Sequence, residues 1–231
     1  MKNRVLIGSL ILFLIAPTAF SNYYIEWLEI YHDSKSEIQN LSLTTTQSGD
    51  YSMSYTITGP SFLENLVYDG TATYHQVASL NTSTHGYSSI TTRNDWQLIA
   101  YSDPYNNGIS VRFFNQGYWQ PDVFLPESEL ISGLCYRFAS STEYITYTTE
   151  SASGDSYLKL MHQGMGPWGD ETLAQIGSYQ IANIFDAAAR SDGSLGIVWW
   201  DNIDDVIKFG IFDPDGTFTV SEVVDDINIC H

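Results

Sequence analysis

The chain has 231 residues and carries 27 aspartates and glutamates against 9 lysines and arginines, so its formal net charge is −18. A surface this acidic repels phosphate backbones and anionic lipids, which argues against nucleic acid and lipid as partners. The length allows one large all-β domain.

The first 21 residues have the layout of a secretory signal peptide. Lys2 and Arg4 precede an apolar stretch over residues 5–20, which ends in Ala-Phe-Ser. This order of basic, apolar and small residues predicts cleavage after Ser21 and a secreted or periplasmic protein over residues 22–231. The alternative is an uncleaved membrane anchor. Later segments fall short of the roughly 18 apolar residues of a spanning helix, so no membrane span is expected after cleavage.

Residues 23–31 predict one strand ahead of the repeated part of the chain. A shift by one repeat step matches this strand to the outer strand of a sheet whose other strands are missing. At the other end, the sequence stops where the first strand of another unit would begin. We therefore expect strand 23–31 to complete another blade and the ring to be incomplete, as in a fragment. The alternative is a closed ring of four blades with an additional outer strand.

Aromatic residues and turn glycines recur at a nearly fixed step along the rest of the chain. The aromatic positions are Tyr55, Tyr101, Tyr147 and Trp199, and the glycines are Gly70, Gly117, Gly164 and Gly216. The aromatic step is 46 residues and lengthens to 52 before the last copy. Such a step is typical of repeat folds, and it lies between the lengths of two common propeller repeats.

Aligning these positions gives four units, at about residues 41–81, 87–127, 134–176 and 181–224. Each unit has four short runs rich in β-branched and aromatic residues, separated by Gly, Asn, Asp and Ser, and such runs predict strands joined by hairpins. We therefore expect an all-β, propeller-like array of four 4-stranded antiparallel blades. A β-sandwich of many strands is the alternative, but that fold would not by itself require a fixed repeat length. Residues 181–190 alone resemble a short helix, but their register favours a strand.

The turn after the third strand of each unit has a recurring pattern. Gln163-Gly164 leads to Trp168, and Asp215-Gly216 leads to Phe218. These turns resemble a degraded Asp-box, the S-x-D-x-G-x-x-W turn of sialidase-like propellers. The resemblance covers residues 41–224, although none of the four copies is complete. It implies a sialidase-like propeller fold.

The resemblance alone does not imply the enzyme. Sialidases of that family bind the substrate carboxylate with three arginines and use a tyrosine nucleophile, a glutamate and an acidic proton donor. After the signal peptide this chain has only four arginines, Arg93, Arg112, Arg137 and Arg190. Arg137, at the start of a first strand, is the one expected at the channel mouth. No catalytic residue is assigned, and a non-catalytic protein is favoured over an enzyme.

The loops after each second strand are the candidate ligand-binding region, because function in propellers usually lies on loops at one end. Aromatic rings can cover a sugar face, and Asp and Asn can bind its hydroxyls. The candidate ligand-binding residues are Asp103, Tyr105, Asn106, Trp200, Asp201 and Asp204. The alternative is that these are ordinary solvated turns. No cofactor is expected, although the acidic cluster at residues 201–205 has oxygen ligands of the kind that Ca²⁺ takes.

Three functions remain open from the sequence. The first is a secreted, non-catalytic propeller that binds an extracellular glycan or protein on its loops. The second is a fragment of a sialidase-like glycoside hydrolase, and the third is a structural extracellular repeat. Cys135 and Cys230 fall at similar points of different repeats, so we expect no disulfide between them, even though secretion would permit one.

Overall fold

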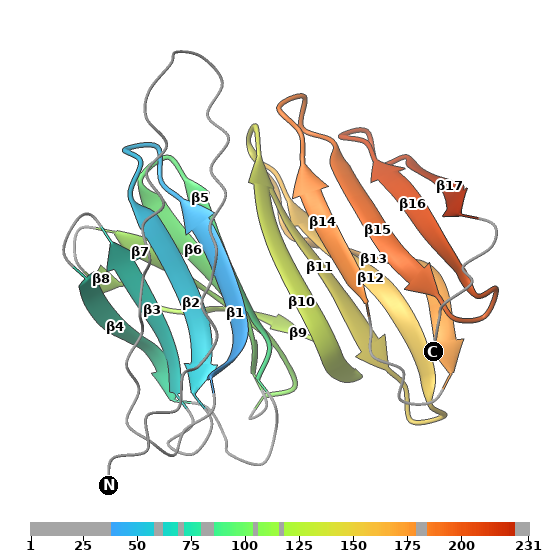
Figure 1. The fold of residues 1–231 in the computed structure, drawn as a ribbon, viewed down its shortest axis with the longest axis horizontal. Coiled ribbons are helices and arrows are strands. Elements are labelled where there is room, and N and C mark those ends of the chain that lie inside the picture. Colours follow the sequence, from blue (N-terminus) through green and yellow to red (C-terminus); the bar gives the residue numbers. More distant parts are fainter. Residues whose placement is uncertain are drawn as a thin grey trace, which may run out of the picture.

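The computed structural model is built of strands throughout the part that it describes (Figure 1). The described residues are 38–57, 62–68, 72–79, 86–103, 106–115, 118–178 and 184–224. The predicted signal peptide, the predicted strand at 23–31 and Cys230 lie outside them. Nothing in the described part of the chain forms a helix of the length and hydrophobicity that a bilayer crossing requires.

In the described residues, seventeen strands form four antiparallel sheets, each made of consecutive strands. Blade 1 contains β1(Ile38–Thr45), β2(Tyr51–Ile57), β3(Phe62–Tyr68) and β4(Ala72–Ser79). Blade 2 contains β5(Ser88–Arg93), β6(Trp96–Asp103), β7(Gly108–Asn115), β8(Tyr118–Trp119) and β9(Val123–Pro126). Blade 3 contains β10(Leu130–Ala139), β11(Thr142–Glu150), β12(Asp155–Gln163) and β13(Gly169–Ser178). Blade 4 contains β14(Phe185–Ala189), β15(Leu195–Asp201), β16(Val206–Phe212) and β17(Phe218–Val224).

The predicted all-β array of four antiparallel blades is confirmed, with one local difference in blade 2. There the fourth strand is divided: β8 pairs with one end of β7, and β9 pairs with the other end. The segment 185–189, whose composition also fits a helix, is a strand that pairs with β15. Its Ala187 is 4% exposed, so packing between blades overrides the local helix preference.

The blades stack through their first strands and through apolar side chains between neighbouring sheets. β1 contacts β5, β5 contacts β10, and β10 contacts β14. The aromatic residues of the repeat occupy equivalent places in the second strands β2, β6, β11 and β15. Tyr55, Tyr101, Tyr147 and Trp199 are all at most 3% exposed. The repeat step in the sequence therefore reflects one packing position that is used in each blade.

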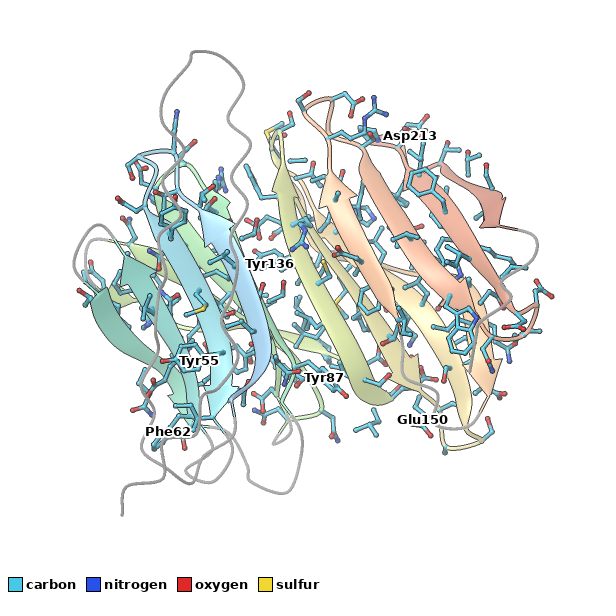
Figure 2. All side chains as sticks on the ribbon, viewed as in Figure 1. Tyr55, Phe62, Tyr87, Tyr136, Glu150 and Asp213 are labelled. Atoms are coloured by element: carbon cyan, nitrogen blue, oxygen red, sulfur yellow. The ribbon has the colours of Figure 1, made fainter. Side chains whose placement is uncertain are left out.

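The two ends of the sheets carry different connections. The second strands β2, β6, β11 and β15 all end at the same end of the sheets, at the bottom of Figure 1. We call this the loop end. Figure 2 places Glu150 at this end and Asp213 at the opposite one. At the opposite end the β14–β15 and β16–β17 turns carry Gly193 and Gly216 with φ of 92° and 89°, a conformation that glycine adopts without strain.

Candidate binding site

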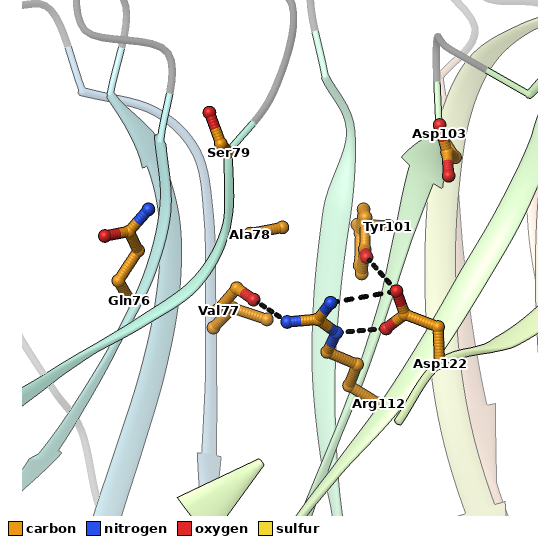
Figure 3. Close-up of a pocket in the computed structure, with 8 residues that line it drawn as sticks. All are labelled: Gln76, Val77, Ala78, Ser79, Tyr101, Asp103, Arg112 and Asp122. Atoms are coloured by element: carbon orange, nitrogen blue, oxygen red, sulfur yellow. Dashed lines mark hydrogen bonds and ion pairs between the residues drawn. The ribbon is translucent and has the colours of Figure 1, made fainter. Parts of the chain in front are cut away.

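A pocket of about 410 Å³ lies between blade 1 and blade 2 (Figure 3). Blade 1 contributes the last residues of β4, and blade 2 contributes β6, β7 and the segment that precedes β9. The pocket is lined by Gln76, Val77, Ala78, Ser79, Tyr101, Asp103, Arg112 and Asp122. Both β4 and β6 finish near the loop end, so the pocket lies toward that end of the molecule.

Arg112 is the central group of this pocket. Its Nε and NH2 atoms donate to the two oxygens of Asp122, with 2.9 Å between NH2 and Oδ2. Its NH1 atom donates to the carbonyl oxygen of Val77 in blade 1. Hydrogen bonding to Asp122 raises the pKa of Arg112, although burial opposes this. The guanidinium therefore stays charged and joins the two blades.

The Tyr101 hydroxyl adds a buried polar group to the same wall. It donates to Asp122 Oδ2 at 3.2 Å, while the tyrosine side chain is 3% exposed. Burial raises the pKa of Tyr101 to about 12. The hydroxyl is therefore neutral at physiological pH. Because a phenol both donates and accepts, it can take part in a hydrogen-bond network with a hydroxyl-bearing ligand.

Asp103 is the one sequence-predicted site residue that lines this pocket. Asn106 holds its carboxylate from the loop, with Nδ2 at 2.9 Å and the backbone nitrogen at 3.2 Å. Ser110 Oγ donates to the same carboxylate at 3.2 Å. Asn106 itself is exposed. The predicted partner Tyr105 lies outside the described residues.

The charges around the pocket favour a ligand with hydroxyl groups and no negative charge. Arg112 supplies one positive charge, and Asp103 and Asp122 supply two negative charges. Three guanidinium N–H groups donate to Asp122 and Val77, and Tyr101 is a further hydrogen-bond partner of the Arg112 side chain. Gln76 and Ser79 add neutral hydrogen-bonding groups.

The other predicted residues form a separate cluster in blade 4. Asp201 is 4% exposed and accepts hydrogen bonds from the backbone nitrogens of Ile203 and Asp204, at 2.9 and 3.2 Å. Lys208 Nζ lies 2.8 Å from Asp201 and 2.5 Å from Asp204. The Trp200 indole donates to Asp205 at 3.3 Å. These contacts fix the shape of the β15–β16 loop.

The structure therefore places the predicted residues in two blades that are not neighbours. Blade 2 carries Asp103 and Asn106, and blade 4 carries Trp200, Asp201 and Asp204. Lys208 supplies the cationic partner of the blade 4 acids. Among the residues that the structure describes, no three His, Cys, Asp or Glu side chains are grouped so that they could hold a metal ion.

A second polar network lies between blades 2 and 3. Glu127 accepts from Lys159 Nζ at 3.0 Å, from the Tyr147 hydroxyl at 2.9 Å and from the backbone of Glu129 at 3.1 Å. The Glu127 and Lys159 side chains are only 5% and 13% exposed. Burial acts to raise the pKa of Glu127, but Lys159 and the other donors outweigh it and hold the pKa below its usual value.

The residue types of a sialidase nucleophile occur here in a buried position. Tyr147 lies beside Glu127, and Tyr55 donates to Glu64 at 3.0 Å. Both tyrosines are 0% exposed. Burial and two neighbouring carboxylates raise the pKa of Tyr147, which keeps its hydroxyl protonated.

The four arginines after residue 21 have four different acidic partners. The pairs are Arg93 with Glu143, Arg112 with Asp122, Arg137 with Asp186 and Arg190 with Asp192. Arg137 borders the space between the first strands, as the sequence predicts, in a cavity of about 320 Å³. Its Nε donates to the carbonyl oxygen of Ala187 at 2.7 Å. Its guanidinium thus fastens blade 3 to blade 4.

Cys135 borders the same cavity as a buried free thiol. Its Sγ lies 3.7 Å from an oxygen of Asp186. Burial raises the pKa of the thiol to about 11, so it remains protonated. Because Cys230 lies outside the described residues, the absence of a disulfide between the two cysteines stays a prediction.

Sequence reasoning did not identify Arg112, Asp122 and Val77 as neighbours. Arg112 lies in β7, the third strand of blade 2, and Val77 comes from another blade 35 residues earlier. The repeat gives only a partial signal. Lys159 and Lys208 pair directly with repeat aromatics, whereas Tyr101 pairs with Ser110 and Arg112 lies two residues further along β7.

The fold has counterparts among solved structures. A variant of the Aleuria aurantia lectin, in complex with α-methyl-L-fucoside, matches with a TM-score of 0.61 and 11% identity, over 87% of this chain and 67% of the lectin. The subtype N10 neuraminidase-like protein of a little yellow-shouldered bat isolate from Guatemala matches with a TM-score of 0.59 and 8% identity, over 81% of this chain and 58% of that protein. The Hadza microbial sialidase Hz136 matches with a TM-score of 0.59 and 9% identity, over 82% of this chain and 47% of the sialidase.

These similarities concern the fold. A scan against protein-family models finds no match, and a search of curated proteins finds none. The chain spans about half to two thirds of the length of these three solved structures. At identities of 8 to 11%, the chain shares the β-propeller fold with sialidase-like proteins and with a lectin that was solved with a fucoside.

Proposed function

We propose that this protein is a secreted, non-catalytic propeller that binds a glycan in the pocket between blades 1 and 2. The observation that carries the proposal is the Arg112–Asp122–Tyr101 group on the wall of the pocket of about 410 Å³. Oriented donors and acceptors with little freedom to move are what recognition of sugar hydroxyls requires. The shared fold with a lectin supports this function.

The ligand class follows from the charges of the site. Asp103 and Asp122 face the pocket, and the whole chain carries −18. A sialylated or sulfated sugar would place a negative charge beside two carboxylates, which costs free energy. We therefore expect neutral sugars to bind and anionic sugars to be rejected. Asp103 is the predicted contact that lines this pocket, and Asn106 hydrogen-bonds to its carboxylate from the adjoining loop.

A glycan array of neutral and sialylated oligosaccharides, followed by calorimetry, tests the proposal. We expect binding to at least one neutral glycan, with and without Ca²⁺, and a loss of affinity of about tenfold or more in Arg112→Gln. The matched control is Arg190→Gln, because Arg190 pairs with Asp192 in the exposed β14–β15 turn. Binding to no glycan would refute the function, and equal effects of the two variants would refute the site.

A further inference from the structure

The fourth strands of blades 1, 3 and 4 share a β-bulge, which is one extra residue on one strand of a pair. In each of these blades the bulge lies beside the third-strand residue that pairs with the repeat aromatic. In blade 1 the register shifts between Leu63 and Glu64, which leaves Val77 as the extra residue. The extra residues at this place in blades 3 and 4 are Leu173 and Val223. The bulge therefore belongs to the repeat, as the aromatic position does.

In blade 2 the bulge is displaced along the strand. Beside Ser110, the residue that pairs with Tyr101, the register between β7 and β9 is regular. The extra residue comes later. From Val111 to Phe114 the strand β7 advances by three residues, whereas the partners of these two on the fourth strand are four residues apart. This displacement is what divides the fourth strand of blade 2 into β8 and β9.

The displaced bulge places Asp122 opposite Arg112. The backbone nitrogen of Gln120 donates to the carbonyl oxygen of Phe113 at 2.8 Å. Pro121 and Asp122 are therefore the two residues that oppose Arg112. Bulges redirect side chains in this way, and here the Asp122 carboxylate accepts hydrogen bonds from Nε and NH2 of Arg112. Pro121 has no backbone N–H, so it fits a position that the ladder leaves unpaired.

The bulge of blade 1 supplies the other contact of Arg112. A bulge leaves its extra residue outside the regular ladder of hydrogen bonds. Val77 is 2% exposed, so its carbonyl oxygen needs a partner within the protein. Arg112 NH1 donates to this oxygen from the neighbouring blade (Figure 3). The guanidinium is thus held between two bulges, one from each blade.

The junction between blades 3 and 4 makes the corresponding contact with backbone. Blade 3 has a second extra residue, Ile176, between the partners of Ser156 and Tyr157. Ile176 is 3% exposed, and its carbonyl oxygen accepts from the backbone nitrogen of Asn202 at 2.9 Å. A backbone group of the β15–β16 loop therefore does there what a charged side chain does between blades 1 and 2. The bulge of blade 1 differs because its partner is a guanidinium that borders a pocket.

Close packing against β7 fixes the register of β9. A Cβ atom at Gly108 would lie 2.3 Å from the carbonyl oxygen of Leu125 and 2.6 Å from the Phe124 ring, so a glycine is required where these backbones approach. The backbone nitrogen of Glu127 also donates to the carbonyl oxygen of Asn107 at 3.0 Å. Because β9 cannot slide along β7, the extra residue stays between β9 and β8.

We propose that the displaced bulge of blade 2 shapes the pocket and that Asp122 is its positioning residue. The bulge brings the Asp122 carboxylate to Arg112, and this carboxylate orients the guanidinium across the gap toward Val77. The effect on glycan affinity rests on the proposed function, whereas the orientation of Arg112 does not.

Exchange of the Arg112 Nε proton with water, measured by NMR on the full chain, tests the positioning. The proton should exchange slowly, because it donates to Asp122 and the Arg112 side chain is 26% exposed. Asp122→Asn should speed its exchange about tenfold, since a charge-assisted hydrogen bond is weakened. The signal is assigned by its absence in Arg112→Lys. The matched control is Asp186→Asn, which removes the acidic partner of Arg137 and should leave the Arg112 signal unchanged.

Deletion of Gln120 tests the bulge itself. Removing one residue restores a regular register, so Asp122 should no longer face Arg112 and the Nε proton should exchange as fast as in Asp122→Asn. Deletion of Met165, at a fully exposed position in the β12–β13 turn, is the control and should change neither exchange nor affinity. If the chain without Gln120 does not fold, the Asp122→Asn result decides.

Calorimetry with the glycan selected on the array separates this inference from the function. Asp122→Asn should weaken binding by about tenfold or more. If no glycan binds while Asp122→Asn still speeds the exchange at Arg112, the function is refuted and the positioning stands. If a glycan binds and Asp122→Asn changes neither the affinity nor the exchange, the positioning is overturned and the function stands.

Discussion

The polar junction between blades 1 and 2 and the one between blades 2 and 3 contain the same kinds of side chain, but the first borders a pocket and the second is buried. Each has a repeat tyrosine whose hydroxyl bonds to a carboxylate, and a cation from the third strand. In the first, Tyr101, Arg112 and Asp122 border a pocket of about 410 Å³. In the second, the Glu127 and Lys159 side chains are 5% and 13% exposed.

The difference teaches which features turn a polar junction into a site. Arg112 reaches across to the carbonyl of Val77, so its guanidinium spans the gap between blades without filling it. Lys159 instead lies between Glu127 and Glu129, at 3.0 and 2.9 Å, and closes the space. Arg112 and Lys159 lie at different register positions relative to their repeat tyrosines, and the first junction has a pocket whereas the second is a buried ion-pair network.

The largest expected effect concerns the buried junction. Lys159→Ala leaves Glu127 buried without its cation, and removing one partner of a buried pair costs about 3 kcal/mol or more. Arg112→Ala, at the more exposed pair, should cost about 1 kcal/mol. Urea unfolding of both variants measures the difference. Equal losses would contradict the contrast between a packing junction and a binding junction.

Glycan affinity should show the reverse order. Arg112→Gln should weaken binding of a neutral glycan by about tenfold or more, whereas Lys159→Gln should leave the affinity of the folded fraction unchanged. Calorimetry at a temperature where both variants are folded measures this. If Lys159→Gln lowered affinity as much as Arg112→Gln, the ligand would bind at the second junction.

Replacing the repeat tyrosine of each junction, Tyr101 or Tyr147, should give smaller effects that also distinguish the two junctions. Tyr147→Phe should destabilise by about 1 kcal/mol, because the hydroxyl bonds to Glu127 and Asp170, and should not change glycan binding. Tyr101→Phe should change the affinity, because its hydroxyl lies on the pocket wall. Thermal unfolding and a binding titration of each variant separate the two roles.

The smallest expected effects concern how the free energy of unfolding changes with pH, and two buried carboxylates should change it in opposite directions. Glu127 has a lowered pKa in the folded protein, so its stabilisation is present above the unfolded pKa of about 4.5 and is lost as pH falls through the folded value. Glu143 has a raised pKa because burial outweighs Tyr136 and Arg93, so its ionisation opposes folding as pH rises above about 4.5.

Glu127→Gln should therefore destabilise the protein at pH 7, and Glu143→Gln should stabilise it. Both differences should shrink as the pH falls below 4.5. Unfolding free energies measured between pH 3 and pH 7 test the two signs. A stability change of the same sign in both variants at pH 7 would contradict the assigned environments of the two carboxylates.

The blades could be predicted from the sequence because each repeats one packing position. Tyr55, Tyr101 and Tyr147 keep their 46-residue step since each fills the same place in a second strand. Local propensity alone would have assigned a helix to residues 185–189, and only the repeat register predicts the strand found there.

The candidate site could be predicted only in part. The sequence predicts Asp103 as a contact because it lies in a polar loop that follows a second strand. Arg112 and Val77 could not be paired from the sequence, because their contact depends on how two blades pack in three dimensions. The sequence predicts Asp201 as a ligand contact. Its burial and its ion pair with Lys208 could not be predicted from the run of acidic residues alone.

A crystal structure of the full chain with the neutral glycan of highest affinity tests the central claim most directly. We predict the sugar between blades 1 and 2, with its hydroxyls within hydrogen-bonding distance of Arg112 and Asp103. A sugar bound instead at the β15–β16 loop, beside Trp200 and Asp204, would contradict the account.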